Sequence, residues 1–375
     1  MNMSKINRIT IMRLGTSNFG KIGTYNVQEV GLAEALIKKG FHVNVLYLNR
    51  PTDMVLQDET YAYVYYLPHK HIGLHGIFDV RLLDKFNPDF LIMFSDSQLW
   101  SKNVIEWCER KKIKCVHYFG NVLSDNPKRL HQFYTKLILM RNRSSYKKSI
   151  NIAKTKKVKT ELESHNIRCS AVVNVGLDES ILRPEVNLDI EIRKSLGYSL
   201  EDTVLLFVGR LVDYKKPLMA CDIMKKMRSN GINARLIIIG KGSQEELLKA
   251  YIYKEELTEY VNCVGRVPYE DMYKYFVASD CIINLSHKEI FGMTILEAMY
   301  YSIPVVAHTA PGPNDIIEDK KTGYLIDSDD LNVWCNAIKS AIENRIELGT
   351  ASRKCITDNY MWDKIAEQFC ELVGV

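Results

Sequence analysis

The chain has 375 residues, of which 25% are charged and 46% are hydrophobic, an ordinary globular composition with room for two domains. No apolar run approaches the roughly 18 to 20 residues of a membrane-spanning helix, and the start lacks a signal-peptide pattern, so we expect a cytoplasmic protein. Nine cysteines without a Cys-x-x-Cys pair predict buried thiols in a reducing compartment, not a zinc site or a disulfide framework.

The first half alternates apolar runs with amphipathic ones, which predicts a parallel sheet covered by helices. Strands are predicted over 8–14, 43–48, 90–94, 114–118, 149–153 and 171–175. Helices are predicted over 27–39, 99–111 and 129–148. A polar segment from Glu185 to Tyr198 follows, and it indicates a domain boundary near residue 182.

One segment of the first half is strongly basic, although the net charge of the whole chain is only +5. Between Arg110 and Arg168 sixteen Lys or Arg stand against three Asp or Glu, so this segment carries +13 and the remainder −8. Apolar and cationic residues mix from Arg129 to Lys148, which is typical of a helix on an anionic membrane surface. A core-packed helix with a solvated basic rim explains the pattern equally well. Nucleic-acid binding is not expected, because no recognition motif accompanies the charge.

The second half repeats the alternating pattern. Strands are predicted over 204–209, 236–239, 261–264, 282–285, 305–307 and 324–326, with a helix over 294–301 after the fourth of them. A last amphipathic segment, 362–373, has no strand after it, and we expect it to pack on the first domain.

Two carboxylates, Glu289 and Glu297, flank a Phe-Gly turn where a predicted strand leads into a helix. Amides at such a helix start point out at the carboxyl end of a sheet, where anions bind. The alternative is that Thr294 and Glu297 form only a capping box and that Glu289 is a solvated loop residue.

A second candidate site follows the predicted strand 204–209. Arg210 and Lys215 stand at its end, and two cations at the mouth of a parallel sheet would clamp a diphosphate. Taken singly, each would more often be a surface cation. Together with the acidic loop they indicate a site for a nucleotide diphosphate.

This combination closely resembles the retaining glycosyltransferases of the GT-B fold (group 1, or family 4), which use nucleotide sugars and carry a Glu-x7-Glu motif. The resemblance covers nearly the whole chain and rests on Gly209, Arg210, Lys215, Gly265, Glu289, Phe291, Gly292 and Glu297. It implies an α/β GT-B architecture, in which two Rossmann-like domains have parallel sheets facing a central cleft. Residues 1–181, with a C-terminal helix at about 359–375, would bind the acceptor, and residues 182–358 the nucleotide sugar.

Carried over to this chain, the resemblance implies that Arg210 and Lys215 hold the diphosphate. It implies that Glu297 accepts hydrogen bonds from the ribose hydroxyls and that Glu289 contacts hydroxyls of the transferred sugar. Further donor contacts are implied for Gly209, for the loop Gly265, Arg266 and Val267, which would touch the base, and for Phe291, Gly292, Met293 and Thr294. Lys216 is a plausible substitute for Lys215.

In the first domain, Gly23 and Thr24 resemble the family's glycine loop, although the family often has two adjacent glycines there. His117 matches a histidine that the family carries at a strand end, and it would help to position donor or acceptor. Its alternative is a hydrogen-bonded structural histidine.

The resemblance further implies hexosyl transfer with retention of anomeric configuration and favours a UDP-sugar donor. No metal or other cofactor is expected, and Asp327-Ser328-Asp329, which matches a metal-binding pattern, is interpreted as a helix-capping loop. The acceptor is expected to be a glycan or a lipid-linked molecule of the bacterial cell surface, which would make the protein peripheral on the inner face of the membrane. A nucleotide-sugar epimerase and a non-catalytic partner protein are the alternative functions.

Overall fold

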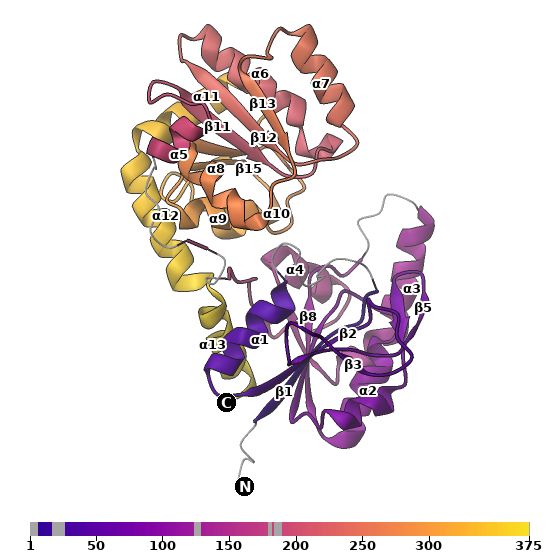
Figure 1. Cartoon of the computed structure of the whole chain (residues 1–375). Coiled ribbons are helices and arrows are strands. Elements are labelled where there is room, and N and C mark those ends of the chain that lie inside the picture. The colour runs from indigo at the N-terminus through magenta and orange to yellow at the C-terminus, as the bar shows by residue number, and fades with distance from the viewer. Residues whose placement is uncertain (1–6, 17–26, 124–128, 179–181, 184–189, 375) are drawn as a thin grey trace. The chain divides into compact units, whose positions relative to one another are not determined.

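The computed structural model describes residues 7–16, 27–123, 129–178, 182–183 and 190–374, and the chain forms two compact units (Figure 1). Unit 1 comprises Met1–Gly176 and Trp362–Val375, and unit 2 comprises Leu177–Met361. The sequence predicts boundaries near residues 182 and 359, a few residues from both divisions. Among the described residues, no helix has the length and hydropathy to cross a membrane.

Within its described residues, unit 1 is built on an eight-stranded sheet in the order β10-β9-β8-β7-β1-β2-β4-β3. The strand β3 pairs antiparallel with β4, and the other neighbours are parallel. The strands are β1 (Arg8–Arg13), β2 (His42–Tyr47), β3 (Leu56–Gln57), β4 (Val64–Tyr66), β7 (Phe90–Phe94), β8 (Lys114–Phe119), β9 (Ile150–Ala153) and β10 (Ala171–Val172). A separate hairpin is formed by β5 (Lys70–Ile72) and β6 (His75–Ile77).

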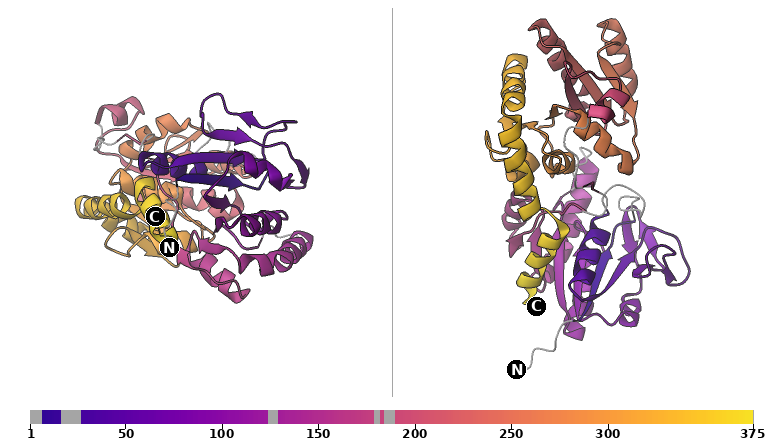
Figure 2. Two further views of the ribbon diagram at one scale, coloured as in Figure 1. Left: turned by 90° about the horizontal axis from the view of Figure 1, so that it is seen from below. Right: turned by 60° about the vertical axis from the view of Figure 1, so that its left-hand side comes forward.

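Helices cover both faces of this sheet (Figures 1 and 2). They are α1 (Gln28–Lys38), α2 (Ser101–Lys111), α3 (Arg129–Tyr146), α4 (Lys156–Ser164), α13 (Trp362–Val373) and the short 3₁₀ helix η1 (Val80–Lys85). At the start of α13, Trp362 packs over the glycines Gly31 of α1 and Gly176, where an added methyl group would overlap its indole. The last helix of the chain thus packs on the first helix of unit 1.

The described part of unit 2 contains a six-stranded parallel sheet in the order β13-β12-β11-β14-β15-β16. The strands are β11 (Thr203–Val208), β12 (Ala234–Ile239), β13 (Val261–Gly265), β14 (Cys281–Asn284), β15 (Val305–His308) and β16 (Tyr324–Ile326). All six lie within one or two residues of their predicted positions. A mostly parallel sheet in unit 1 and a parallel sheet in unit 2, each covered by helices, confirm the predicted α/β fold class.

Helices bury both faces of the unit 2 sheet, and successive side chains of each strand point to opposite faces. The helices that cover the sheet are α5 (Ile190–Ser195), α6 (Pro217–Ser229), α7 (Glu245–Lys254), α8 (Met272–Ala278), α9 (Met293–Tyr300), α10 (Pro311–Ile316), α11 (Leu331–Glu343) and α12 (Arg345–Asn359), with 3₁₀ helices η2 (Asp213–Lys215) and η3 (Tyr269–Asp271). In β12, Leu236 and Ile238 join the core cluster under α6, α7 and α11, whereas Ile237 and Ile239 join the cluster under α8 and α9.

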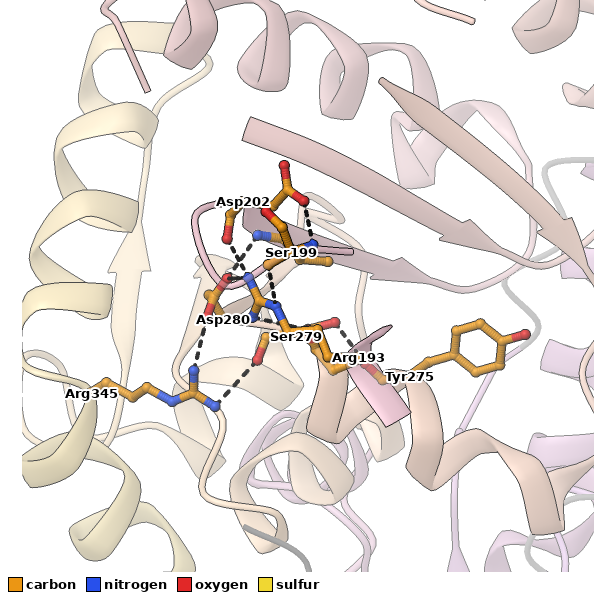
Figure 3. Close-up of polar contacts among 9 residues, drawn as sticks. Arg193, Ser199, Asp202, Tyr275, Ser279, Asp280 and Arg345 are labelled. Atoms are coloured by element: carbon orange, nitrogen blue, oxygen red, sulfur yellow. Dashed lines mark hydrogen bonds and ion pairs between the residues drawn. The ribbon is translucent and has the colours of Figure 1, made fainter. Parts of the chain in front are cut away.

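A buried charge network fixes the amino end of this sheet (Figure 3). Asp280 precedes β14, and its two carboxylate oxygens each accept a hydrogen bond of 3.0 Å from the guanidinium of Arg193, which is 2% exposed. Arg345 of α12 donates to the same carboxylate at 2.9 Å, and so does the backbone N–H of Val204 at 2.8 Å. One carboxylate therefore joins α5, β11, β14 and α12.

Replacing Asp280 with Asn should lower the free energy of unfolding by about 3–5 kcal/mol, because Arg193 would keep a buried charge without its counterion. Urea unfolding of the full chain measures the change. Glu246→Gln is the matched control in the same unit, since this carboxylate is 87% exposed in its ion pair with Lys249 and should contribute under about 1 kcal/mol. Equal effects of the two substitutions would contradict the role given to the network.

Candidate functional site in unit 2

The strand order of unit 2 reverses between β11 and β14. Numbered along the chain within this unit, the order is 3-2-1-4-5-6, the doubly wound arrangement that binds ligands outside the carboxyl ends of the two central strands. The loops that follow these two strands carry Arg210 and Lys215 on one side and Glu289 on the other. The fold therefore brings together residues that lie about eighty positions apart in the sequence.

Lys215 and Glu289 form an ion pair across the reversal point, between the Nζ of the lysine and the Oε2 of the glutamate. Their side chains are only 15% and 16% exposed. The side-chain amide of Asn284, the last residue of β14, donates to the same oxygen at 3.4 Å. Because an ammonium group has three N–H donors, Lys215 keeps donors for a second anion beside Glu289.

The neighbouring cations have different positions. Arg210 is exposed, and its guanidinium donates at 2.6 Å to the hydroxyl of Tyr214. Lys216 pairs with Asp329, away from Glu289. The structure therefore places Lys215, and not Lys216, beside the acidic loop.

Glycines end three adjacent strands of the sheet, and a cation follows each of them. Gly209, Gly240 and Gly265 precede Arg210, Lys241 and Arg266. The Gly240 N–H donates to the carbonyl of Gly265 at 2.7 Å, and a methyl group on Gly240 would overlap the carbonyl oxygen of Gly209. Close backbone packing thus sets three cations along one sheet edge. Sequence reasoning missed Lys241, although the repeated Gly-cation pattern at strand ends would have indicated it.

Glu297 lies inside α9 and is 1% exposed. Its Oε1 accepts a hydrogen bond of 2.9 Å from the hydroxyl of Tyr269, and burial together with this carboxylate raises the pKa of that phenol. The helix begins at Met293 with Gly292 as its N-cap, at a φ of 94°. Thr294 consequently lies within the first turn, so the capping-box alternative is wrong.

The other predicted donor-site residues lie around this edge. Arg266 is exposed, whereas Val267 and Phe291 are half-buried against the core cluster under α8 and α9. Met293 and Thr294 are half-buried at the start of α9. The backbone carbonyl of Glu289 accepts from the N–H of Gly312 at 2.9 Å, which anchors the acidic loop to α10.

The Asp327-Ser328-Asp329 segment lies in the loop before α11. The N-cap of that helix is the next residue, Asp330, whose carboxylate accepts from the N–H of Asn332 at 2.8 Å. Asp327 accepts from the hydroxyl of Thr309 at 2.8 Å. The segment therefore lies in a loop before a helix, as predicted, but the residue that caps the helix is Asp330, directly after the segment.

Of the predicted site residues in unit 1, the structure describes only His117. Gly23 and Thr24 lie outside the described residues. His117 is fully buried within β8, where its Nε2 lies 2.8 Å from the carbonyl oxygen of Ser95 and its ring stacks on Phe119. Burial lowers the pKa of His117 to about 3. Contact with donor or acceptor requires an exposed ring, so this conformation corresponds to the structural alternative.

Comparisons with known proteins find glycosyltransferases among the similar proteins. The family model described as "Glycosyl transferases group 1" matches residues 189–359. A D-inositol 3-phosphate glycosyltransferase of Corynebacterium diphtheriae is 26% identical over 54% of this chain and 50% of its own length, so the match spans half of that relative. An uncharacterised glycosyltransferase of Methanocaldococcus jannaschii is 24% identical over 92% of this chain and 93% of its own.

The chain also resembles solved structures over nearly its whole length. HepE of Anabaena, solved in complex with UDP, superposes with a TM-score of 0.75 at 16% identity, covering 98% of this chain and 99% of HepE. A likeness at this level of identity establishes the fold.

Gly240→Ala should destabilise unit 2 by more than about 2 kcal/mol, since the methyl group would meet backbone that cannot move without separating β11 from β12. Gly231→Ala is the matched control. Gly231 also has a positive φ, of 83°, but nothing lies near its added methyl group, so only the conformational cost of about 1 kcal/mol should appear. Denaturant unfolding of both variants measures the difference, and equal losses would refute the close-packing argument.

His117 should make stability depend on pH. Below about pH 6.5 the unfolded chain binds a proton at this ring, whereas the folded ring stays neutral down to about pH 3, so stability falls as the pH falls through this window. His117→Gln should remove up to about 1.4 kcal/mol per pH unit of this decline, measured by urea unfolding between about pH 6 and 4. An unchanged decline together with lost turnover would support the catalytic role instead.

Proposed function

We propose that this chain, which belongs to the group 1 glycosyl transferases and has the GT-B fold, transfers a sugar from a nucleotide-diphosphate sugar to a hydroxyl group of an acceptor. The observation that carries the proposal is the Lys215–Glu289 pair at the strand-order reversal, with Arg210 on the same edge. A diphosphate needs cations, and a sugar needs hydrogen-bond acceptors within a few ångströms of them. This pair offers both.

The reaction exchanges one bond for another. The bond between the anomeric carbon and the diphosphate oxygen breaks, the acceptor oxygen bonds to that carbon, and the nucleoside diphosphate leaves with the electron pair. The acceptor's proton passes to a phosphate oxygen of the leaving group. As the bond breaks, negative charge grows on the diphosphate, and Arg210 and Lys215 stabilise it most strongly in the transition state.

Glu289 has two functions in this proposal. It accepts hydrogen bonds from the sugar, and it holds Lys215 in position before the donor arrives, so little reorganisation is needed during the reaction. Glu297 would accept from the ribose hydroxyls, which must join or replace the hydroxyl of Tyr269 at its carboxylate. The exposed Arg266 follows the strand end at Gly265 and would face the base.

The finer features of the proposal are retention of configuration, a UDP-sugar donor and a glycan or lipid-linked acceptor. The Glu-x7-Glu motif supports retention, and the fold shared with HepE, which was solved with UDP, supports a nucleotide at this edge. We propose metal-independent catalysis, with Arg210 and Lys215 supplying the positive charge. A lipid-linked acceptor would place the protein at the inner face of a membrane.

Lys215→Gln and Arg210→Gln should each reduce turnover about 10²- to 10³-fold, since each removes a charge from the departing diphosphate. Lys216→Gln is the matched control, and it should change turnover only a few-fold because Lys216 pairs with Asp329. Hydrolysis of UDP-sugars without acceptor, in the presence of EDTA, supplies the readout.

Calorimetric titration of UDP, GDP and ADP into the wild type and Arg210→Gln comes before the kinetics. Binding of one nucleotide that weakens in the variant supports the donor site and identifies the base. No binding of any nucleotide by the folded wild type would overturn the transferase proposal in favour of a non-catalytic partner protein. A greater loss of turnover in Lys216→Gln than in Lys215→Gln would overturn the assignment of the two lysines.

A further inference from the structure

Helix α3 of unit 1 exposes an apolar stripe. Five large hydrophobic side chains of this helix are between 44% and 66% exposed, and they are Leu130, Phe133, Tyr134, Leu137 and Met140. Phe133 and Tyr134 are adjacent, and the other successive members are three residues apart, so all five lie on one broad face of an α-helix. Singly exposed apolar residues are ordinary, but a contiguous stripe marks an interaction surface.

The opposite face of α3 is occupied by its own unit. Ile138, Leu139 and Tyr146 are buried. The Asn142 amide donates to the carbonyl of Gln98 at 2.7 Å, and the exposed Arg141, four residues after Leu137, donates to the carbonyl of Leu99 at 2.6 Å. The helix is thus bonded to the segment just before α2, while its apolar stripe is exposed.

A cationic row runs beside the apolar stripe. Lys136 and Arg143 are two helical turns apart on one side of the helix, and the exposed Lys147 follows directly after its last residue. In the described part of the chain these three make no ion pair, whereas the nearby Lys148 pairs with Glu109 at 2.7 Å. The helix itself has no Asp or Glu in its 18 residues. Nothing on α3 therefore balances the positive charge of this row.

We propose that α3 docks unit 1 on the surface of an anionic lipid bilayer. The stripe from Leu130 to Met140 would enter the boundary between headgroups and acyl chains, and Lys136, Arg143 and Lys147 would contact the phosphate groups. An interfacial helix requires this combination of an apolar face and a flanking row of cations. The inference does not depend on which nucleotide unit 2 binds.

Charge separates the bilayer from other occupants of this face. A second copy of the chain would bring two cationic rows together, and their repulsion opposes pairing. A nucleic acid would satisfy the cations but would leave the five apolar side chains against a polar backbone. An anionic bilayer complements both parts of the surface.

The test is sedimentation of the full chain with vesicles of phosphatidylcholine containing about a third phosphatidylglycerol, compared with vesicles of phosphatidylcholine alone. We expect binding to the anionic vesicles that weakens from about 0.05 M to 0.5 M salt. Phe133→Glu with Leu137→Glu should reduce the partition coefficient at least tenfold. Lys136→Gln with Lys147→Gln should reduce it about 5- to 30-fold, since each cation near an anionic surface contributes about a factor of five.

Leu247→Glu with Tyr253→Glu is the matched control. It adds the same two charges in place of exposed apolar side chains, 54% and 83% exposed, on the unit 2 helix α7, and binding should be unchanged. Circular dichroism and nucleotide calorimetry establish that each variant is folded, and light scattering follows self-association. Absence of wild-type binding, an equal loss in the control, or a change in molecular mass without a change in vesicle binding would overturn the proposal.

Discussion

The ion pair between Lys215 and Glu289 organises the site of unit 2. Taking two charges largely out of water costs several kcal/mol, and their attraction only partly offsets this cost, so the pair is weak evidence for stability. The position of the pair in the sheet explains its presence better than stability does. Each partner follows a different central strand, and the pair spans the point where the strand order reverses. A cation and an anion fixed side by side at this point suit a ligand that has a diphosphate next to hydroxyl groups.

The two ends of the unit 2 sheet are stabilised in different ways. At the amino end, Asp280 accepts hydrogen bonds from both Arg193 and Arg345, so its carboxylate is bonded within the protein. At the carboxyl end, Gly209, Gly240 and Gly265 allow the strand ends to approach closely, and the cations that follow them are exposed to solvent. The first end holds the sheet together through saturated contacts. The second end keeps its polar groups available for a ligand.

The sequence predicts the long strands of both units well, because buried parallel strands are continuous apolar runs such as 204–208 and 236–239. It does not predict the short strands between residues 56 and 77, which are only two or three residues long. Motif spacing located the acidic loop and the pair of lysines but could not tell which lysine faces Glu289. A tight turn decides this: Lys216 adopts a left-handed conformation with a φ of 53°, and the two side chains diverge. The resemblance implies that His117 stands at a strand end, whereas β8 continues two residues further and the ring is buried in the core.

The two interpretations of the basic helix from Arg129 to Lys148 describe two sides of one element. Ile138 and Leu139 are core residues, whereas Phe133 and Leu137 are exposed, and hydrophobicity alone cannot separate such neighbours. The positive charge does not stabilise the helix, because unbalanced cations along one row repel one another. A row of this kind is therefore better explained by a partner of opposite charge than by the stability of unit 1. If the acceptor is confined to a membrane, docking of this helix would also promote catalysis, because it would raise the local concentration of the acceptor around unit 1.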